Sequence, residues 1–144
     1  MKKIIPVICF LYLSLASASA QRLTVSFNTG WDFHKGDFEN VPKSDSWGKV
    51  NLPHTWNAQD GTDEYPGYYR GIGWYRKVFV PSESWSGKNV VLYFEGVNQE
   101  VHVFLNGEEI GSHKGAFTAF SLEIGDKLIY GHKFLPVFKS SKRE

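Results

Sequence analysis

The sequence feature that constrains this chain most is a β-hairpin signal within residues 98–120, NQEVHVFLNGEEIGSHKGAFTAF. Valine or leucine stands at alternate positions over residues 101–105, and Asn106-Gly107 then interrupts the pattern. A two-residue type I′ turn needs positive φ at both central positions, which Asn and Gly tolerate. The segment therefore predicts two antiparallel strands joined by a tight turn.

The same turn predicts the register of the two strands. With a two-residue loop, Leu105 is expected to face Glu108, and Val103 is expected to face Ile110. The second pair would be apolar and lie on one face of the ladder. Because a slip of one residue would turn that face to the other side, such a pattern specifies the register.

Short alternating segments separated by Gly, Pro and Asn make up most of the remaining chain. No segment shows a sustained apolar repeat at helical spacing. The pattern predicts an all-β fold, an antiparallel sandwich or jelly roll. We expect the dense β-branched and aromatic run at 90–95 to be a central strand. The other expected strands are 23–27, 31–37, 50–52, 71–80 and 120–124.

The first twenty residues have the pattern of a secretory signal peptide. Two lysines precede an apolar run at 4–15, and Ala-Ser-Ala at 18–20 forms a small-residue cleavage site. The run is too short for a membrane span. We therefore expect residues 1–20 to be removed on export to the periplasm or beyond, and residues 21–144 to form one domain.

Composition argues against several classes of function. Residues 21–144 contain 14 Lys and Arg against 15 Asp and Glu, so there is no basic footprint for nucleic acid. The single cysteine, Cys9, lies in the leader, so no disulfide framework is expected. The five histidines show no metal-ligand spacing, and no cofactor motif is present. We expect neither metal nor cofactor.

Three motifs give the chain a family resemblance. They are VNLPHTWN at 50–57, YRGIGWYRK at 69–77 and the hairpin from 101 to 115, with its Leu-Asn-Gly and Gly-Ser-His-Lys-Gly. In this order and spacing they resemble the N-terminal sugar-binding domain of glycoside hydrolase family 2, the β-galactosidase and β-glucuronidase group. The resemblance implies a jelly roll of the galactose-binding type and a carbohydrate partner. Exported enzymes of this type are common in Bacteroides-like Gram-negative bacteria.

In that family an immunoglobulin-like domain and a barrel with two catalytic glutamates follow this domain, and neither is found in the 144 residues. The residues from about 132 onward also depart from the family pattern. Pro136 removes a ladder donor, and Lys139 stands where an apolar residue is expected. These departures suggest a truncated or frameshifted product; the alternative is a short variant whose last strand is a sheet edge.

The family also suggests where sugar contacts lie. The residue after the Pro-His pair, often Asp or Asn, reaches the sugar in family members, and here it is Thr55. Nearby polar and aromatic residues complete the candidate site, although Asn and Asp also cap turns and aromatic side chains also fill β cores. The candidate carbohydrate-binding residues are Thr55, Trp56, Asn57, Asp60, Tyr65 and Tyr68. Trp74, within a predicted strand, is expected in the core.

The leading hypothesis is a sugar-binding domain of an exported family 2 glycosidase that hydrolyses nothing by itself. Retaining hydrolysis needs two facing carboxyl groups. Neighbouring Glu108 and Glu109 would point to opposite faces of a strand and cannot form such a pair. The alternatives are a stand-alone carbohydrate-binding module and a structural domain that packs on a catalytic barrel.

Overall fold

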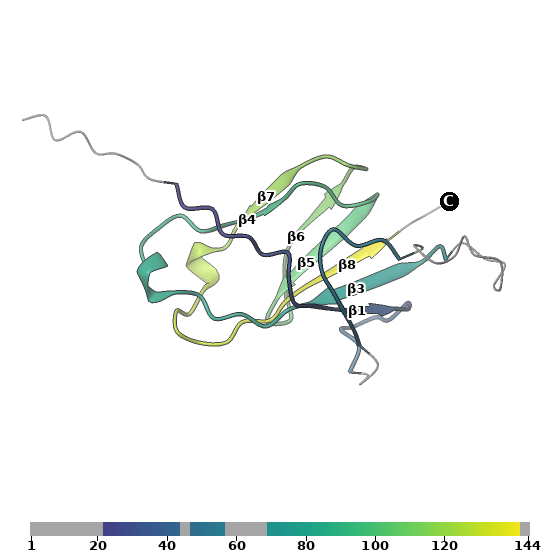
Figure 1. Cartoon of the computed structure of the whole chain (residues 1–144), viewed down its shortest axis with the longest axis horizontal. Coiled ribbons are helices and arrows are strands. Elements are labelled where there is room, and N and C mark those ends of the chain that lie inside the picture. The colour runs from purple at the N-terminus through teal and green to yellow at the C-terminus, as the bar shows by residue number, and fades with distance from the viewer. Residues whose placement is uncertain (1–21, 44–46, 57–68, 142–144) are drawn as a thin grey trace, which may run out of the picture.

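The computed structural model describes residues 22–43, 47–56 and 69–141. In these residues all regular structure is β-strand apart from two short 3₁₀ turns, so the predicted all-β class is confirmed (Figure 1). Neither turn has the length or apolar character of a membrane span. The elements are β1 (Trp31–Lys35), β2 (Gly48–Val50), β3 (Ile72–Arg76), η1 (Glu83–Trp85), β4 (Val91–Phe94), β5 (Glu100–Leu105), β6 (Glu108–Lys114), β7 (Phe120–Glu123), η2 (Gly125–Lys127) and β8 (Pro136–Ser141).

The described strands form two antiparallel sheets. The larger has the order β2-β1-β3-β8-β5-β6, and the smaller pairs β4 with β7. The smaller sheet packs against the inner face of the larger one, and the rings of Phe94 and Phe138 meet with centroids 5.9 Å apart. Burial of these aromatic faces is the main force holding the sheets together. The predicted sandwich is therefore confirmed.

The hairpin forms as predicted at its turn but not along its length. Asn106 and Gly107 have φ of 53° and 91°, and Leu105 pairs with Glu108. Val103, however, pairs with Gly111, because the register shifts at a bulge next to it. The expected pairing of Val103 with Ile110 is wrong, since the bulge inserts one extra residue into β6.

Gly111 explains why the bulge suits this fold. A Cβ atom at Gly111 would lie 2.7 Å from Leu122 Cδ2, so β7 approaches β6 more closely than any larger residue would allow. Ile110 packs against both apolar clusters of the interior. The bulge thus brings an isoleucine and a glycine to the place where the two sheets meet.

The C-terminal strand is central and not an edge. β8 lies between β3 and β5, and Val137 and Phe138 are 1% and 5% exposed. Pro136 is its first residue, a position that proline tolerates. Lys139 lies on the outer face, with Nζ 5.3 Å from the ring of Trp74. The edge position that the short-variant alternative gave to the last strand is therefore wrong.

Two further strand predictions also fail. Of residues 90–95, only Val91–Phe94 form a strand, β4, which in the described part of the chain pairs only with β7 and is not central. Residues 23–27 form no strand; Leu23 and Val25 are 72% and 55% exposed. Only Phe27 of this segment is anchored, by edge contacts with Trp31 and Phe79 at 5.5 and 5.1 Å. Residues 23–27 alternate as a strand would, but no strand in the described part of the chain pairs with them.

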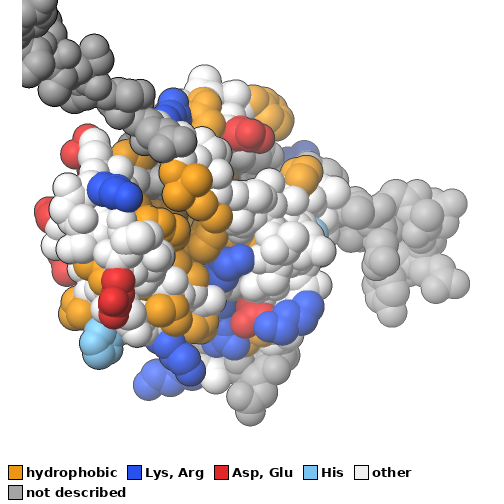
Figure 2. Space-filling model, turned by 60° about the vertical axis from the view of Figure 1, so that its left-hand side comes forward, with side chains coloured by type: hydrophobic (Ala, Val, Ile, Leu, Met, Phe, Trp, Pro, Cys, Tyr) orange, Lys and Arg blue, Asp and Glu red, His pale blue; other side chains and the backbone are white. Residues whose placement is uncertain are grey.

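Trp74 is 1% exposed, which confirms its predicted burial. It lies on the outer face of the large sheet, under Phe104 and Lys139. The opposite, inner face carries the larger apolar cluster, whose buried members are Trp31, Trp56, Tyr75, Val101, Val103 and Phe138. Other apolar side chains remain visible among charged ones on the molecular surface (Figure 2).

Candidate functional site

The candidate site lies at one end of the sandwich. The register places Ile72 beside Ser141, Ser141 beside Glu100, and Glu100 beside Lys114. The beginnings of β3 and β5 and the ends of β8 and β6 therefore lie side by side. Loops that are far apart in the sequence, at 69–71, 96–99 and 115–119, emerge together at this end.

The segment after β2 runs back toward this same end along the inner face. At its start, Leu52 N donates to Asn28 O at 2.7 Å, and Gly30 N donates to Asn51 Oδ1 at 3.0 Å. Its Leu52–Pro53 peptide bond is cis. Further along, His54 Nδ1 and Tyr75 Oη form a hydrogen bond of 2.9 Å.

Burial keeps the His54 and Tyr75 pair uncharged. Desolvation, and secondarily the positive charge of Lys35, lowers the pKa of His54. Burial raises the pKa of the Tyr75 phenol well above its usual value, and a hydrogen bond with Trp56 opposes this effect only in part. The pair is therefore a neutral hydrogen bond that fixes the backbone just before Thr55.

The two described candidate residues have different surroundings. Thr55 is exposed, whereas Trp56 is 8% exposed. The Trp56 indole contacts the rings of Phe33 and Tyr69 at centroid distances of 6.3 and 6.0 Å. The Thr55 hydroxyl is thus accessible to a ligand, whereas the Trp56 indole is part of the hydrophobic core. Sugar contact by either residue stays a prediction.

The other four candidates, Asn57, Asp60, Tyr65 and Tyr68, lie outside the described residues. The structure therefore brings Thr55 and Trp56 to the end of the sandwich but does not place the rest of the predicted site.

A polar cavity of about 310 Å³ lies at this end, on the outer face of the large sheet. It was not predicted, because its side chains come from separate strands and a loop with no shared motif. The polar residues that line it are Asp37, Glu100, His102, Lys139 and Ser141. Hydroxyl-bearing ligands match such a lining of donors and acceptors.

Glu100 and His102 of this cavity contact each other and neighbouring ionisable groups. His102 Nδ1 lies 2.8 Å from Glu109 Oε1, and His102 Nε2 lies 3.5 Å from Glu100 Oε1. Lys114 Nζ lies 3.3 Å from the same Glu100 oxygen. The two carboxylates are therefore held on opposite sides of an imidazole ring and do not face each other. Among the residues that the structure describes, no group of three His, Cys, Asp or Glu could hold a metal ion.

A second charge cluster, on the outer face near β2, has a structural role. Asp32 contacts Lys49 Nζ at 2.5 Å and Arg76 Nε at 3.2 Å, and the Arg76 guanidinium lies 4.1 Å from the Trp47 ring centroid. Burial alone would raise the pKa of Asp32, but the hydrogen bonds and charges of Lys49 and Arg76 lower it overall. The carboxylate therefore stays ionised and ties three strands together.

Comparison with known proteins agrees with this architecture. The pattern of "Glycosyl hydrolases family 2, sugar binding domain" matches residues 22–141. A β-glucuronidase of Bacteroides fragilis is 43% identical over 126 residues, which span 86% of this chain and 18% of that protein. A β-galactosidase of Thermoanaerobacter pseudethanolicus is 33% identical over 121 residues, 77% of this chain and 16% of its own length.

Solved structures show the same likeness. The crystal structure of a Bacteroides uniformis β-glucuronidase superimposes with a TM-score of 0.76 at 30% identity, covering 86% of this chain and 15% of that one. A family 2 member from Bacteroides cellulosilyticus gives a TM-score of 0.69 at 28% identity, covering 82% and 17%. The chain thus spans 15–18% of the length of these four relatives. It belongs to glycoside hydrolase family 2 and corresponds to the family's sugar-binding domain.

Proposed function

We propose that this chain binds a pyranoside, a β-galactoside, a β-glucuronide or a related glycan, at the end of the sandwich that carries Thr55. The match of residues 22–141 to the family's sugar-binding domain carries the proposal. The exposed Thr55 supplies a hydroxyl at that end on the side of the inner face, and the polar cavity supplies further hydrogen-bonding groups at the same end on the outer face. In relatives of greater length, a site here would work together with the downstream domains.

We also propose that the chain by itself does not hydrolyse glycosides. Retention requires an acid and a nucleophile carboxyl about 5–5.5 Å apart across the scissile bond. Near the cavity, Glu100 and Glu109 bind opposite nitrogen atoms of His102, so this pair cannot serve. Turnover of nitrophenyl β-galactoside or β-glucuronide by the pure chain would overturn this proposal.

Sugar binding is tested by titrating the chain with methyl β-D-galactopyranoside and methyl β-D-glucuronide in a calorimeter. Saturable heat with at least one sugar supports a stand-alone carbohydrate-binding module. A flat response with both favours the remaining alternative, a structural domain that packs on a catalytic barrel.

Export is proposed from the leader at residues 1–20, with the periplasm or the extracellular space as destination. Mass spectrometry of the protein recovered from a Gram-negative host tests it. A mature N-terminus at Gln21 in the periplasmic fraction is expected. Unprocessed protein in the cytoplasm would contradict export.

A further inference from the structure

Phe117 is the most exposed large apolar residue in the described part of the chain, at 81%. It lies in the loop between β6 and β7, and its φ is 61°. A bulky residue rarely adopts positive φ, because its Cβ then crowds the backbone. The backbone conformation at this position is therefore imposed by its surroundings, and it turns an aromatic ring toward solvent.

Several contacts hold this loop in place. Gly115 N donates to Gln99 O at 2.8 Å. His113 Nε2 and Thr118 Oγ1 form a hydrogen bond of 2.8 Å, and the His113 ring stacks on Phe120 with centroids 4.4 Å apart. These contacts attach both sides of the loop to the neighbouring strands, so the backbone around Phe117 is held in a fixed conformation.

Two glycines allow the loop to pack so closely. A Cβ atom at Gly96 would lie 3.4 Å from Phe117 Cα, and one at Gly115 would lie 2.6 Å from Thr118 Oγ1. Gly115 also has φ of 155°. The loop thus packs closely against residues 96–99. This packing fixes the position of the Phe117 ring before any ligand binds.

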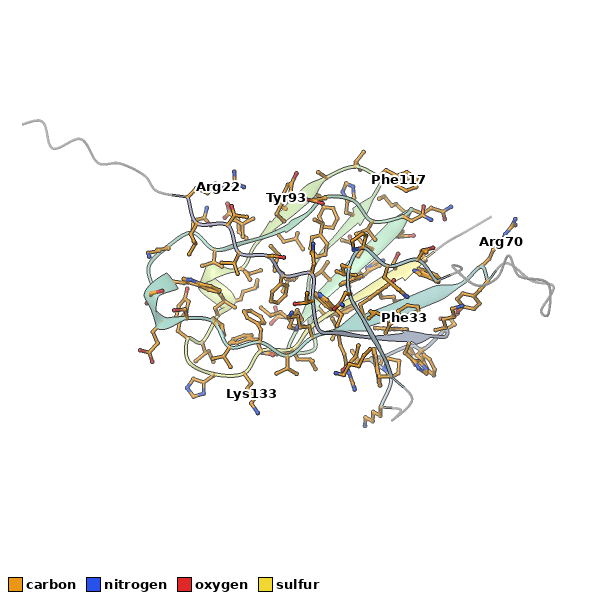
Figure 3. The ribbon with its side chains drawn as sticks, viewed as in Figure 1. Arg22, Phe33, Arg70, Tyr93, Phe117 and Lys133 are labelled. Carbon is orange, nitrogen blue, oxygen red and sulfur yellow. The ribbon has the colours of Figure 1, made fainter. Side chains whose placement is uncertain are left out.

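The position of Phe117 links it to the candidate site. Its loop follows Lys114, which pairs with Glu100 at the lip of the polar cavity. The loop therefore emerges at the same end of the sandwich as residues 69–71. Figure 3 shows Phe117 and Arg70 on the same side of the molecule, with their side chains pointing outward.

We propose that Phe117 is an aromatic platform for the apolar face of a pyranose ring, which deepens the sugar binding proposed above and rests on it. The axial C–H bonds of a β-galactoside or β-glucuronide carry partial positive charge and suit the negative face of an aromatic ring. The hydroxyl groups at the edge of the sugar suit the polar residues around it.

The surroundings of Phe117 fit a sugar better than a protein partner. Its neighbours in the loop, Ala116, Thr118 and Ala119, are small, and Lys114 and Gln99 are polar; all five are exposed. The apolar surface at the tip is thus about the size of one ring. Stable protein interfaces bury far more area around each anchor, about 800 Å² per partner.

The test compares variants of the full chain in saturation-transfer NMR and calorimetry, with methyl β-D-galactopyranoside and methyl β-D-glucuronide as probes. Phe117→Ala removes the ring, and Phe117→Gly removes it while accepting the positive φ. Both should weaken binding about tenfold, the effect of losing one aromatic contact. Phe117→Trp should retain it.

Tyr93→Ala is the matched control, because Tyr93 is also a strongly exposed aromatic, at 60%, but lies on β4. Its affinity should equal that of the unaltered chain. Thermal unfolding of Phe117→Ala and Tyr93→Ala should match that of the unaltered chain, since neither ring is in the core, and Phe117→Gly, which accepts the positive φ, should unfold at no lower temperature.

The outcomes separate the two proposals. If the unaltered chain binds sugar and Phe117→Gly binds as well, the platform is overturned while sugar binding stands. If Phe117→Ala changes sedimentation and not sugar affinity, the residue is a protein contact and the platform is again overturned. If the unaltered chain binds neither probe, the proposed sugar binding fails, and the platform with it.

Discussion

Gly73 of β3 lies directly beneath the indole ring of Trp56. A Cβ atom at Gly73 would stand 3.1 Å from two atoms of that ring and 2.9 Å from Phe33 Cε2. The missing side chain is what lets the segment carrying Thr55 lie flat on the inner face of the sheet. The close approach of Gly73 and Trp56 therefore couples the core to the candidate sugar-binding end.

The first prediction concerns this contact. Gly73→Ala should destabilise the fold by about 1–3 kcal/mol, because a new methyl group would overpack two aromatic rings that are themselves fixed. Urea unfolding followed by tryptophan fluorescence measures the change. Gly48→Ala on β2 is the control, since the nearest atom to a Cβ there is a backbone oxygen 3.8 Å away. An equal loss in both variants would contradict the packing explanation.

Trp56 also shows where prediction from sequence reached its limit. The motif around it predicted a segment near the sugar, and the structure brings that segment to the end of the sandwich from which residues 69–71, 96–99 and 115–119 emerge. Whether a loop tryptophan points inward or outward depends on what lies beneath it. Here the space above Gly73 allows the Trp56 ring to point inward, and Gly73 is 17 positions away in the sequence.

The same distinction separates the other outcomes. The turn at Asn106-Gly107 and the burial of Trp74 follow from local residue types, so they were predictable. The bulge beside Val103 depends on how closely Leu122 approaches Gly111, a contact between two sheets. The place of β8 in the sheet depends on pairing with two distant strands, which alternation within 136–141 does not encode.

A second prediction follows from the position of β8. Phe138 stacks on Tyr75 at 4.4 Å and touches Trp31 at 5.1 Å. Phe138→Ala should cost about 3–5 kcal/mol, because it leaves a cavity between the two sheets. Thermal unfolding monitored by near-ultraviolet circular dichroism measures it. An edge strand would tolerate this change, so a loss below about 1 kcal/mol would contradict the central position of β8.

A third prediction concerns Asp32 at low pH. Its folded-state pKa is lowered from 3.8, so the unfolded chain takes up the proton first as the pH falls. The stabilisation by Lys49 and Arg76 should be complete well above pH 3.8 and be lost progressively as the pH falls below 3.8 through the lower folded-state pKa. Asp32→Asn should remove that part of the acid dependence. Urea midpoints between pH 7 and pH 3 measure it, with the exposed Asp126→Asn as control; parallel curves for all three proteins would contradict the assignment.

A fourth prediction concerns the hydrogen bond between His54 and Tyr75. Tyr75→Phe keeps the ring stacked on Phe138 but removes the phenol that hydrogen-bonds with both His54 Nδ1 and Trp56. The expected loss is about 1–2 kcal/mol, since each hydrogen bond inside a protein typically contributes about 1 kcal/mol. Guanidinium unfolding at pH 7.5 measures it. No loss of stability would mean that water replaces the phenol at no cost.

The fifth prediction is the pH dependence of the same pair. Desolvation lowers the folded-state pKa of His54 below its ordinary value of 6.5. Because the unfolded chain then binds the proton more readily, stability should be full well above pH 6.5 and decline as the pH falls below 6.5. In His54→Gln, which keeps a hydrogen-bonding side chain without a titrating ring, the decline over this range should be smaller. The exposed His132→Gln is the matched control and should follow the unaltered protein. If the stability of His54→Gln falls with pH as steeply as that of His132→Gln, the proton is taken up at another group. The burial of His54 would then not explain this part of the pH dependence.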